Sequence, residues 1–172
     1  MTTKAQALGR LFDIGTGITP VDSQTTGMTG KRCYVGDCEG VTIVVFKAAG
    51  TANDDPVLDL QEANAASGGT IQDLDIITDY YIKQETTLDN DESWTKVSQS
   101  AASEVTLNAT SAETEMIVAI DVRSDQLSDG YKYLSLNIAD TGSAGAQLIS
   151  VLYIPWGLKV QRAPENLAVL LR

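Results

Sequence analysis

Short runs of β-branched and aliphatic residues alternate with clusters of turn-forming residues along most of this 172-residue chain. Such residues fit the pleated, half-buried surface of a strand, and turn signals about every ten residues are typical of a sandwich or barrel. We therefore predict an all-β fold, an antiparallel β-sandwich with either jelly-roll or immunoglobulin-like Greek-key connectivity. The predicted strands are 41–47, 57–63, 93–97, 104–109, 115–122, 131–139 and 147–154, with 71–88 forming either one bulged strand or two short ones.

The first of these runs, VTIVVFK at 41–47, differs from the others because it is continuously apolar rather than alternating. A continuous run of this length suits a strand that is covered on both faces. In contrast, VLDLQEA at 57–63 alternates with a period of two, as expected of a strand with one buried face.

The two ends of the chain lack the strand pattern and divide it into three parts. Residues 1–32 contain five glycines and one proline with no period of 2 or 3.6, which predicts an extended N-terminal arm before a sandwich domain at 33–157. Residues 158–172 follow Pro155 and Trp156, which end the last run, and are predicted to form a C-terminal arm. This arm is rich in leucine, so we expect it to pack on its own body or on that of a neighbour.

The absence of histidine limits the chemistry of this chain. Histidine is the commonest general base and metal ligand, so Ser-His-Asp triads, Cys-His dyads and histidine-based zinc sites are excluded. We predict no catalytic residue, no metal and no cofactor, and an enzyme is the least favoured class.

The net charge of −11 is concentrated in the middle of the chain. Residues 1–32 hold four basic and two acidic residues, 158–172 hold three basic and one acidic, and 33–157 hold five basic and twenty acidic. An acidic body repels phosphate backbones, so we expect no nucleic-acid partner, whereas the basic ends suit an acidic protein partner. No apolar run reaches about eighteen residues and the start lacks a signal peptide, which predicts no membrane span and cytoplasmic synthesis.

Three polar groups have an alternative interpretation. Cys33 and Cys38 form a lone C-x4-C pair, which we interpret as two structural thiols rather than zinc ligands or a disulfide. The loop 89–92 offers oxygen ligands at near-alternate spacing, so a calcium site is the alternative to a solvated acidic loop. Asp73 and Asp75 share a face if that segment is one strand, as paired glycosidase carboxylates do, but no groove of aromatic residues accompanies them.

The most regular stretch is MIVAIDVRSDQLSDGYKYLSLNIAD, from Met116 to Asp140, in which two alternating runs flank a polar bridge. The offsets of Leu127, Gly130 and Tyr133 in this bridge are similar to a tyrosine corner, in which a tyrosine hydroxyl reaches back to the connection between two sheets. We therefore predict a structural corner, with 115–122 and 131–139 in different sheets.

The order of these segments, VTIVV, DLQEA, WTKV, IDVRSDQLSDGYKY and AQLISVLYI, resembles a class of small structural proteins encoded beside capsid genes in tailed bacteriophages. The resemblance covers about residues 40–157, with weaker similarity in QRAPENL. Proteins of this class are head-associated β-sandwiches that serve as cement or decoration subunits. The resemblance implies a non-enzymatic viral structural protein on the capsid surface of the virion, made in the host cytoplasm.

The resemblance also implies partners, namely the major capsid protein and further copies of this chain, with a trimer favoured by the threefold axes of capsids. Arms that become ordered on contact and repeat over a lattice supply affinity and avidity. We predict that the partner contacts come from apolar side chains of the two arms: Phe12, Ile14, Ile18, Trp156, Leu158, Leu167 and Leu170.

Two alternative functions stay open at this stage. A carbohydrate-binding or receptor-binding fibre module would use exposed aromatic side chains, although we prefer to interpret them as core and interface anchors. A head–tail connector or tail subunit is the second alternative. The aromatic side chains in question are Trp94, Tyr131, Tyr133, Tyr153 and Trp156.

Overall fold

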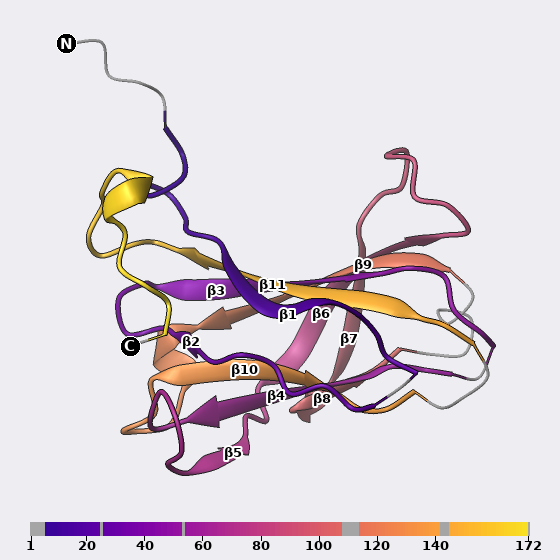
Figure 1. The fold of residues 1–172 in the computed structure, drawn as a ribbon, viewed down its shortest axis with the longest axis horizontal. Helices are drawn as coiled ribbons and strands as arrows, with labels where there is room; N and C mark the ends of the chain where they lie inside the picture. Colours follow the sequence, from indigo (N-terminus) through magenta and orange to yellow (C-terminus); the bar gives the residue numbers. More distant parts are fainter. Residues whose placement is uncertain (1–5, 25, 53, 108–113, 142–144, 172) are drawn as a thin grey trace.

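The computed structural model describes residues 6–24, 26–52, 54–107, 114–141 and 145–171. Two antiparallel sheets lie face to face and enclose one core (Figure 1). The last residues of the predicted strand 104–109, Asn108 and Ala109, lie outside the described residues, as do 1–5 of the predicted N-terminal arm. Within the described part of the chain, no helix is long and apolar enough to cross a membrane.

The larger sheet has six strands and the smaller has five, and every pairing is antiparallel. The six-stranded sheet has the order β1 (Gly15–Asp22), β11 (Leu148–Trp156), β3 (Gly40–Lys47), β9 (Glu115–Arg123), β6 (Ile77–Glu85) and β7 (Thr95–Ala102). The five-stranded sheet has the order β2 (Cys33–Tyr34), β10 (Tyr133–Ile138), β4 (Val57–Ala63) and β5 (Ile71–Asp73), with β8 (Glu104–Thr106) also paired to β4. Two short 3₁₀ turns are at Ser124–Gln126 and Pro164–Asn166.

The predicted all-β sandwich is confirmed, and the strand order distinguishes between the two connectivities considered. The first four strands alternate between the sheets, and β9, β10 and β11 alternate again on the way back. Immunoglobulin-like domains instead keep consecutive strands such as A and B in one sheet. The observed alternation is typical of a jelly roll, to which the β6–β7 hairpin adds two strands at one edge of the larger sheet.

The core forms because inward-facing positions on both sheets are apolar at a period of two. On β3 the inward side chains are Val41, Ile43 and Val45, all fully buried. One hydrogen bond also joins the sheets through the core, since the backbone N–H of Leu136 on β10 donates to the Tyr153 hydroxyl of β11 at 3.0 Å. Burial raises the pKa of that hydroxyl well above its usual range, so it stays protonated.

The prediction that residues 1–32 form an arm without a folded element is wrong for Gly15–Asp22. These residues form β1, which pairs with β11 at the edge of the six-stranded sheet. Two register shifts, between Thr16 and Ile18 and between Ile18 and Val21, interrupt the period of two in this strand. The strand therefore could not be predicted from alternation of apolar residues. Glycine is required at position 17, because a Cβ there would lie 2.8 Å from the ring of Tyr153.

Other strand boundaries are also corrected by the structure. Of the two alternatives predicted for 71–88, two separate strands are observed, since β5 ends at Asp73 and β6 begins at Ile77. The last strand does not end at residue 154 but continues through Pro155 to Trp156. The sequence signal at 93–97 belongs to a longer strand that begins at Thr95.

The corner predicted between the two alternating runs lies between the sheets. Strand β9 belongs to the six-stranded sheet and β10 to the five-stranded sheet, which confirms that the runs do not form a hairpin. Gly130 has a φ of 84°, a backbone conformation that favours glycine, and Leu127 packs against the core. Tyr133 is buried, with its ring centroid 5.3 Å from that of Tyr34. The hydrogen bond predicted for the Tyr133 hydroxyl stays a prediction.

Candidate interaction surface

The N-terminal and C-terminal segments meet at one end of the sandwich, and we call this region the terminal junction (residues 6–14 and 157–171; left side of Figure 1). Backbone hydrogen bonds hold the segments together and to the body. Arg162 N–H donates to the Gly9 carbonyl at 2.9 Å, and Asp13 N–H donates to the Pro155 carbonyl at 2.9 Å. Gly9 has a φ of 81°, and a Cβ on it would lie 2.3 Å from the Arg162 carbonyl oxygen. Only glycine therefore allows the two segments to approach this closely.

The C-terminal segment packs on the body of its own chain in this structure. Tyr34 N–H donates to the Leu170 carbonyl at 2.7 Å, and Lys159 N–H donates to the Asp37 carbonyl at 3.0 Å. The Lys159 ammonium also donates to the Gly36 carbonyl at 2.8 Å. Leu158 and Leu170 pack against the core cluster, so the first of the two locations expected for this segment is the one observed.

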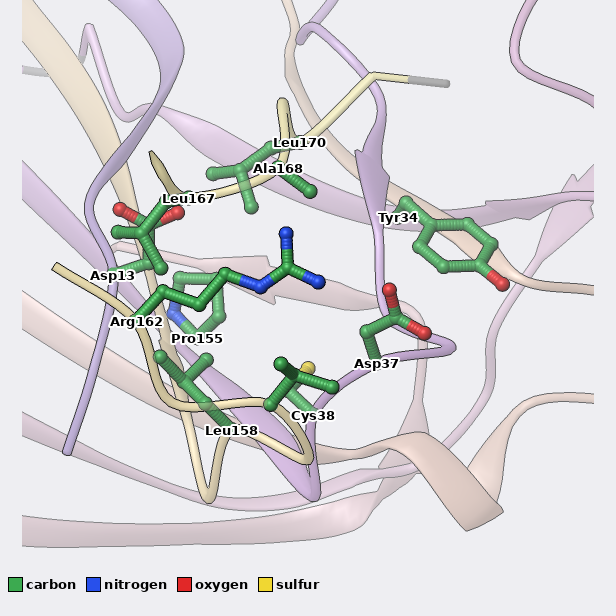
Figure 2. Close-up of a pocket in the computed structure, with 11 residues that line it drawn as sticks. Asp13, Tyr34, Asp37, Cys38, Pro155, Leu158, Arg162, Leu167, Ala168 and Leu170 are labelled. Carbon is green, nitrogen blue, oxygen red and sulfur yellow. The ribbon is translucent and has the colours of Figure 1, made fainter. Parts of the chain in front are cut away.

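A cavity of about 80 Å³ lies within the terminal junction (Figure 2). Its walls are mainly apolar, with the Arg162 side chain extending across the view between Asp13 and Asp37. A wider, open depression of about 440 Å³ adjoins it and is lined by Leu8, Ile14, Leu167 and Val169 among others. This mixture of apolar walls and a few charged groups suits an apolar side chain from a protein partner.

The structure brings six of the seven predicted interface residues to the terminal junction or its border. Phe12 forms a β-bridge with Trp156, and Ile14 is 51% exposed. Ile18 is the exception, because its side chain is only 7% exposed in the core and cannot contact a partner. The other predicted residues, Leu158, Leu167 and Leu170, are half-buried beside the cavity.

The most exposed apolar side chains of this region are not among the predicted interface residues. Leu11 is 65% exposed and Val169 is 69% exposed, and Val160 and Leu171 are each more than half exposed. Their exposure could not be inferred from a segment without periodicity, since no face of it is predicted to point inwards. Exposed apolar side chains gathered in one region mark interaction sites on soluble proteins.

A second apolar surface lies on the outward side of the six-stranded sheet, which we call the outer face. Phe46 is 51% exposed, Leu148 is 55% exposed and Leu152 is 42% exposed. The sequence already indicates this apolar outer face, because the continuous run 41–47 predicts a strand covered on both faces. The described residues cover only its inner face.

The acidic loop 89–92 lies at the tip of the β6–β7 hairpin. Carboxylate oxygens of Glu85, Asp89, Asp91 and Glu92 lie within 4.8 Å of one another. The pKa of Glu85 is raised mainly by Asp91, and the pKa of Asp91 is raised by its hydrogen bond and repulsion with Asp89. All are solvated except for a partly covered Glu92. Exposed acidic groups of this kind are common without a metal, so the cluster by itself does not define a calcium site.

The remaining candidates have structural partners. Cys33 and Cys38 are both free and buried, and desolvation raises their pKa values to about 12 and about 11, so neither is a reactive thiolate. Asp73 accepts a hydrogen bond from Gln61, whereas Asp75 accepts one from the Ser103 backbone. The assumption that both lie on one strand is wrong, because β5 ends between them.

The five aromatic side chains considered for a sugar platform do not all lie on the surface. Tyr133 and Tyr153 are buried in the sandwich. Trp94 is half exposed on the β6–β7 hairpin, where the Lys83 ammonium lies 5.4 Å from its ring centroid. Two of the five candidates therefore lie inside the protein and cannot contact a sugar.

No protein-family model and no curated protein matches this sequence. The resemblance to capsid-associated proteins therefore depends on the sequence segments quoted above alone.

Proposed function

We propose that this protein is a capsid cement or decoration subunit, a non-enzymatic structural protein that binds the major capsid protein of a tailed phage from outside. The observation that carries this proposal is the terminal junction, where both ends of the chain expose apolar side chains beside a small cavity. A cement subunit needs such a contact region on a rigid body that does not change when it binds. The sandwich provides the body, with one continuous core between two sheets.

The charge distribution supports the same surface. The terminal junction holds three basic residues, Arg10, Lys159 and Arg162, and two acidic ones, Asp13 and Glu165, whereas residues 33–157 hold five basic and twenty acidic residues. A capsid surface with acidic patches would attract the junction and repel the rest of the subunit, which fixes the orientation of binding. Repetition over the lattice would then add avidity to a contact of moderate size.

The proposal is tested by co-sedimentation with shells assembled from the major capsid protein encoded with this chain. Leu11→Glu and Val169→Glu each place a carboxylate among exposed apolar side chains of the junction. We expect the combined variant to bind at least about 100-fold more weakly, because an unpaired charge is expensive to desolvate at an interface. Unchanged occupancy of the shells by this variant would disprove the proposal.

Ile71→Glu is the matched control, since Ile71 is 48% exposed but belongs to β5 on the other sheet. This variant is expected to bind like the unmodified protein. Point variants are preferable to removal of residues 1–30, because that truncation would also remove β1 and the buried Ile18. A head–tail connector or tail subunit would instead form rings that electron microscopy reveals without any shell.

A further inference from the structure

The outer face of the six-stranded sheet has an apolar centre that spans four neighbouring strands. The strand registers place Leu152 of β11 opposite Val44 of β3, and Val44 opposite Ala119 of β9. Ala119 in turn lies opposite Tyr81 of β6, which is 39% exposed. These four side chains form one continuous row across the sheet. A second row, from the registers of the same strands, contains Ser150, Phe46, Ile117 and Lys83.

This face is unusual for such an acidic protein. No outward position of β3 or β11 carries an ionised side chain, although residues 33–157 hold twenty acidic residues and only five basic ones. On β9 the outward charges are Glu115, Asp121 and Arg123, and at the far edge of this face β6 carries Asp79, Lys83 and Glu85 and β7 carries Lys96. Contiguous apolar patches on monomeric proteins are rarely larger than a few hundred Å² unless they bind something.

We propose that a second copy of this chain covers the outer face and that the protein self-associates through it. Two such acidic bodies repel each other on most surfaces, and the centre of the outer face is where they approach without carboxylates meeting. The four strands of the apolar centre, spaced about 4.8 Å apart and about eight residues long, offer roughly 500 Å² per copy, and the whole six-stranded face offers roughly 750 Å². A standard interface buries about 800 Å² per partner, so a copy that covers the whole face buries nearly that area.

The packing of the two copies follows from general rules for sheets. Two facing sheets pack about 10 Å apart, with their strands about 30° from parallel. Phe46 and Tyr81 are the aromatic anchors, since large side chains at the centre of an interface supply most of its binding energy. The arrangement also explains the continuous apolar run 41–47, because Val44 and Phe46 become covered as Val41, Ile43 and Val45 already are.

The test is sedimentation velocity of the isolated chain from about 1 to about 200 µM, with Phe46→Glu and Leu152→Glu as variants. We expect the unmodified protein to sediment at twice the mass of one chain, and each variant to raise the dissociation constant at least about 100-fold. Ile71→Glu is the control, because it adds the same charge at an exposed isoleucine on the other sheet and should associate normally.

Several outcomes would overturn the inference. A monomer throughout this concentration range would do so, as would variants that associate like the unmodified protein. Disruption by Val169→Glu but not by Phe46→Glu would place the second copy at the terminal junction instead. Thermal melting checks that each variant is folded, and Phe46→Ser, which adds no charge, replaces any variant that is not. The inference does not depend on the capsid role, because association is measured without shells and shell binding uses different variants.

Discussion

The two ends of β11 differ in which side chains they bury and which they expose. At its beginning lies a closed polar end, where Ser23, Lys47 and Gln147 are completely buried and hydrogen-bonded. At its other end lies the terminal junction, where apolar side chains are left more than half exposed. At the first end, the buried polar groups find their hydrogen-bond partners within the chain itself. The other leaves apolar surface that burial by a partner would stabilise.

The closed polar end contains a hydrogen-bond network around Gln147 and a separately bonded lysine. The Ser23 hydroxyl donates to the Gln147 carbonyl at 3.0 Å and lies 3.1 Å from the Thr141 hydroxyl. The Gln147 side-chain amide donates to the Asp54 carbonyl at 3.4 Å. The Lys47 ammonium donates to the Ala48 and Thr114 carbonyls at 2.9 and 2.7 Å. Because each group has partners here, loss of one leaves another buried without its full complement.

The largest effect on stability is expected at the closed polar end, with Gln147→Ala. This change removes a fully buried side chain and its hydrogen bonds to Ser23 and Asp54, so the free energy of unfolding should fall by about 2–3 kcal/mol. Urea denaturation measures it. Shell binding and self-association should be unchanged under conditions where the variant is folded. A loss below about 0.5 kcal/mol would mean that the buried polar groups at this end do not stabilise the fold.

The next largest effect is the pH dependence of the free energy of unfolding that Lys47 causes. Burial lowers its pKa from 10.5 to about 8, with Asp55 partly opposing the shift. Since the folded-state pKa lies below the ordinary value, protonated Lys47 destabilises the fold in full below about pH 8, and this penalty disappears as the pH rises to about 10.5. Cys33 and Cys38 act oppositely, because their pKa values are raised and the stability they contribute is lost above about pH 9.

Comparison with Lys47→Met isolates the contribution of Lys47 to the pH dependence of stability, because the cysteines titrate in both proteins. Between about pH 8 and pH 10.5 the unmodified protein should gain up to about 2 kcal/mol relative to the variant, a figure reduced for residual solvent screening. Chemical denaturation at a series of pH values measures the difference. Parallel curves for the two proteins would show that Lys47 is not desolvated in the way the structure indicates.

Tyr153→Phe tests the link between the sheets, midway between the two ends. It leaves the Leu136 N–H without its hydroxyl partner inside the core, at a cost of about 1–2 kcal/mol. Tyr133→Phe is the matched comparison, and its cost of about 1 kcal/mol depends on the corner hydrogen bond that the sequence predicts. A negligible loss for Tyr133→Phe would argue against a tyrosine corner while leaving the sandwich unaffected.

The smallest effect is expected at the terminal junction, with Val169→Ser. Its side chain is 69% exposed, so the free energy of unfolding should change by less than about 0.5 kcal/mol. Thermal melting measures the change, and shell co-sedimentation measures binding, which should weaken. A large loss of stability would mean that the junction is part of the core and not a contact surface.

Much of the fold could be predicted from the sequence, because alternation of apolar residues requires no knowledge of distant contacts. The strands at 41–47, 57–63 and 115–122 were located in this way and are observed with boundaries shifted by at most one residue. The corner at Gly130 also follows from local offsets, since it depends on backbone conformation within one connection. Strand β1 could not be predicted, because its two register shifts break the period and its Gly17 is explained only by the ring of Tyr153.

The candidate surface was predicted less completely. Phe12, Ile14 and Leu167 were expected to bind a partner because apolar residues in an aperiodic segment need some cover, and the structure places them in one region. Ile18 satisfied the same criterion but packs inside the sandwich. The sequence cannot separate these cases, since whether an apolar side chain points inwards depends on the strand register.

An all-β sandwich without histidine chemistry, with an acidic body between two mildly basic ends, can be predicted from the sequence alone. These properties depend on composition and on periodicities of a few residues. Only the folded chain shows that both ends meet at one junction, that β1 completes the larger sheet and that the outer face is left apolar. Each of these depends on which strands become neighbours, and antiparallel pairing between distant segments is fixed by packing and hydrogen bonding across the whole chain.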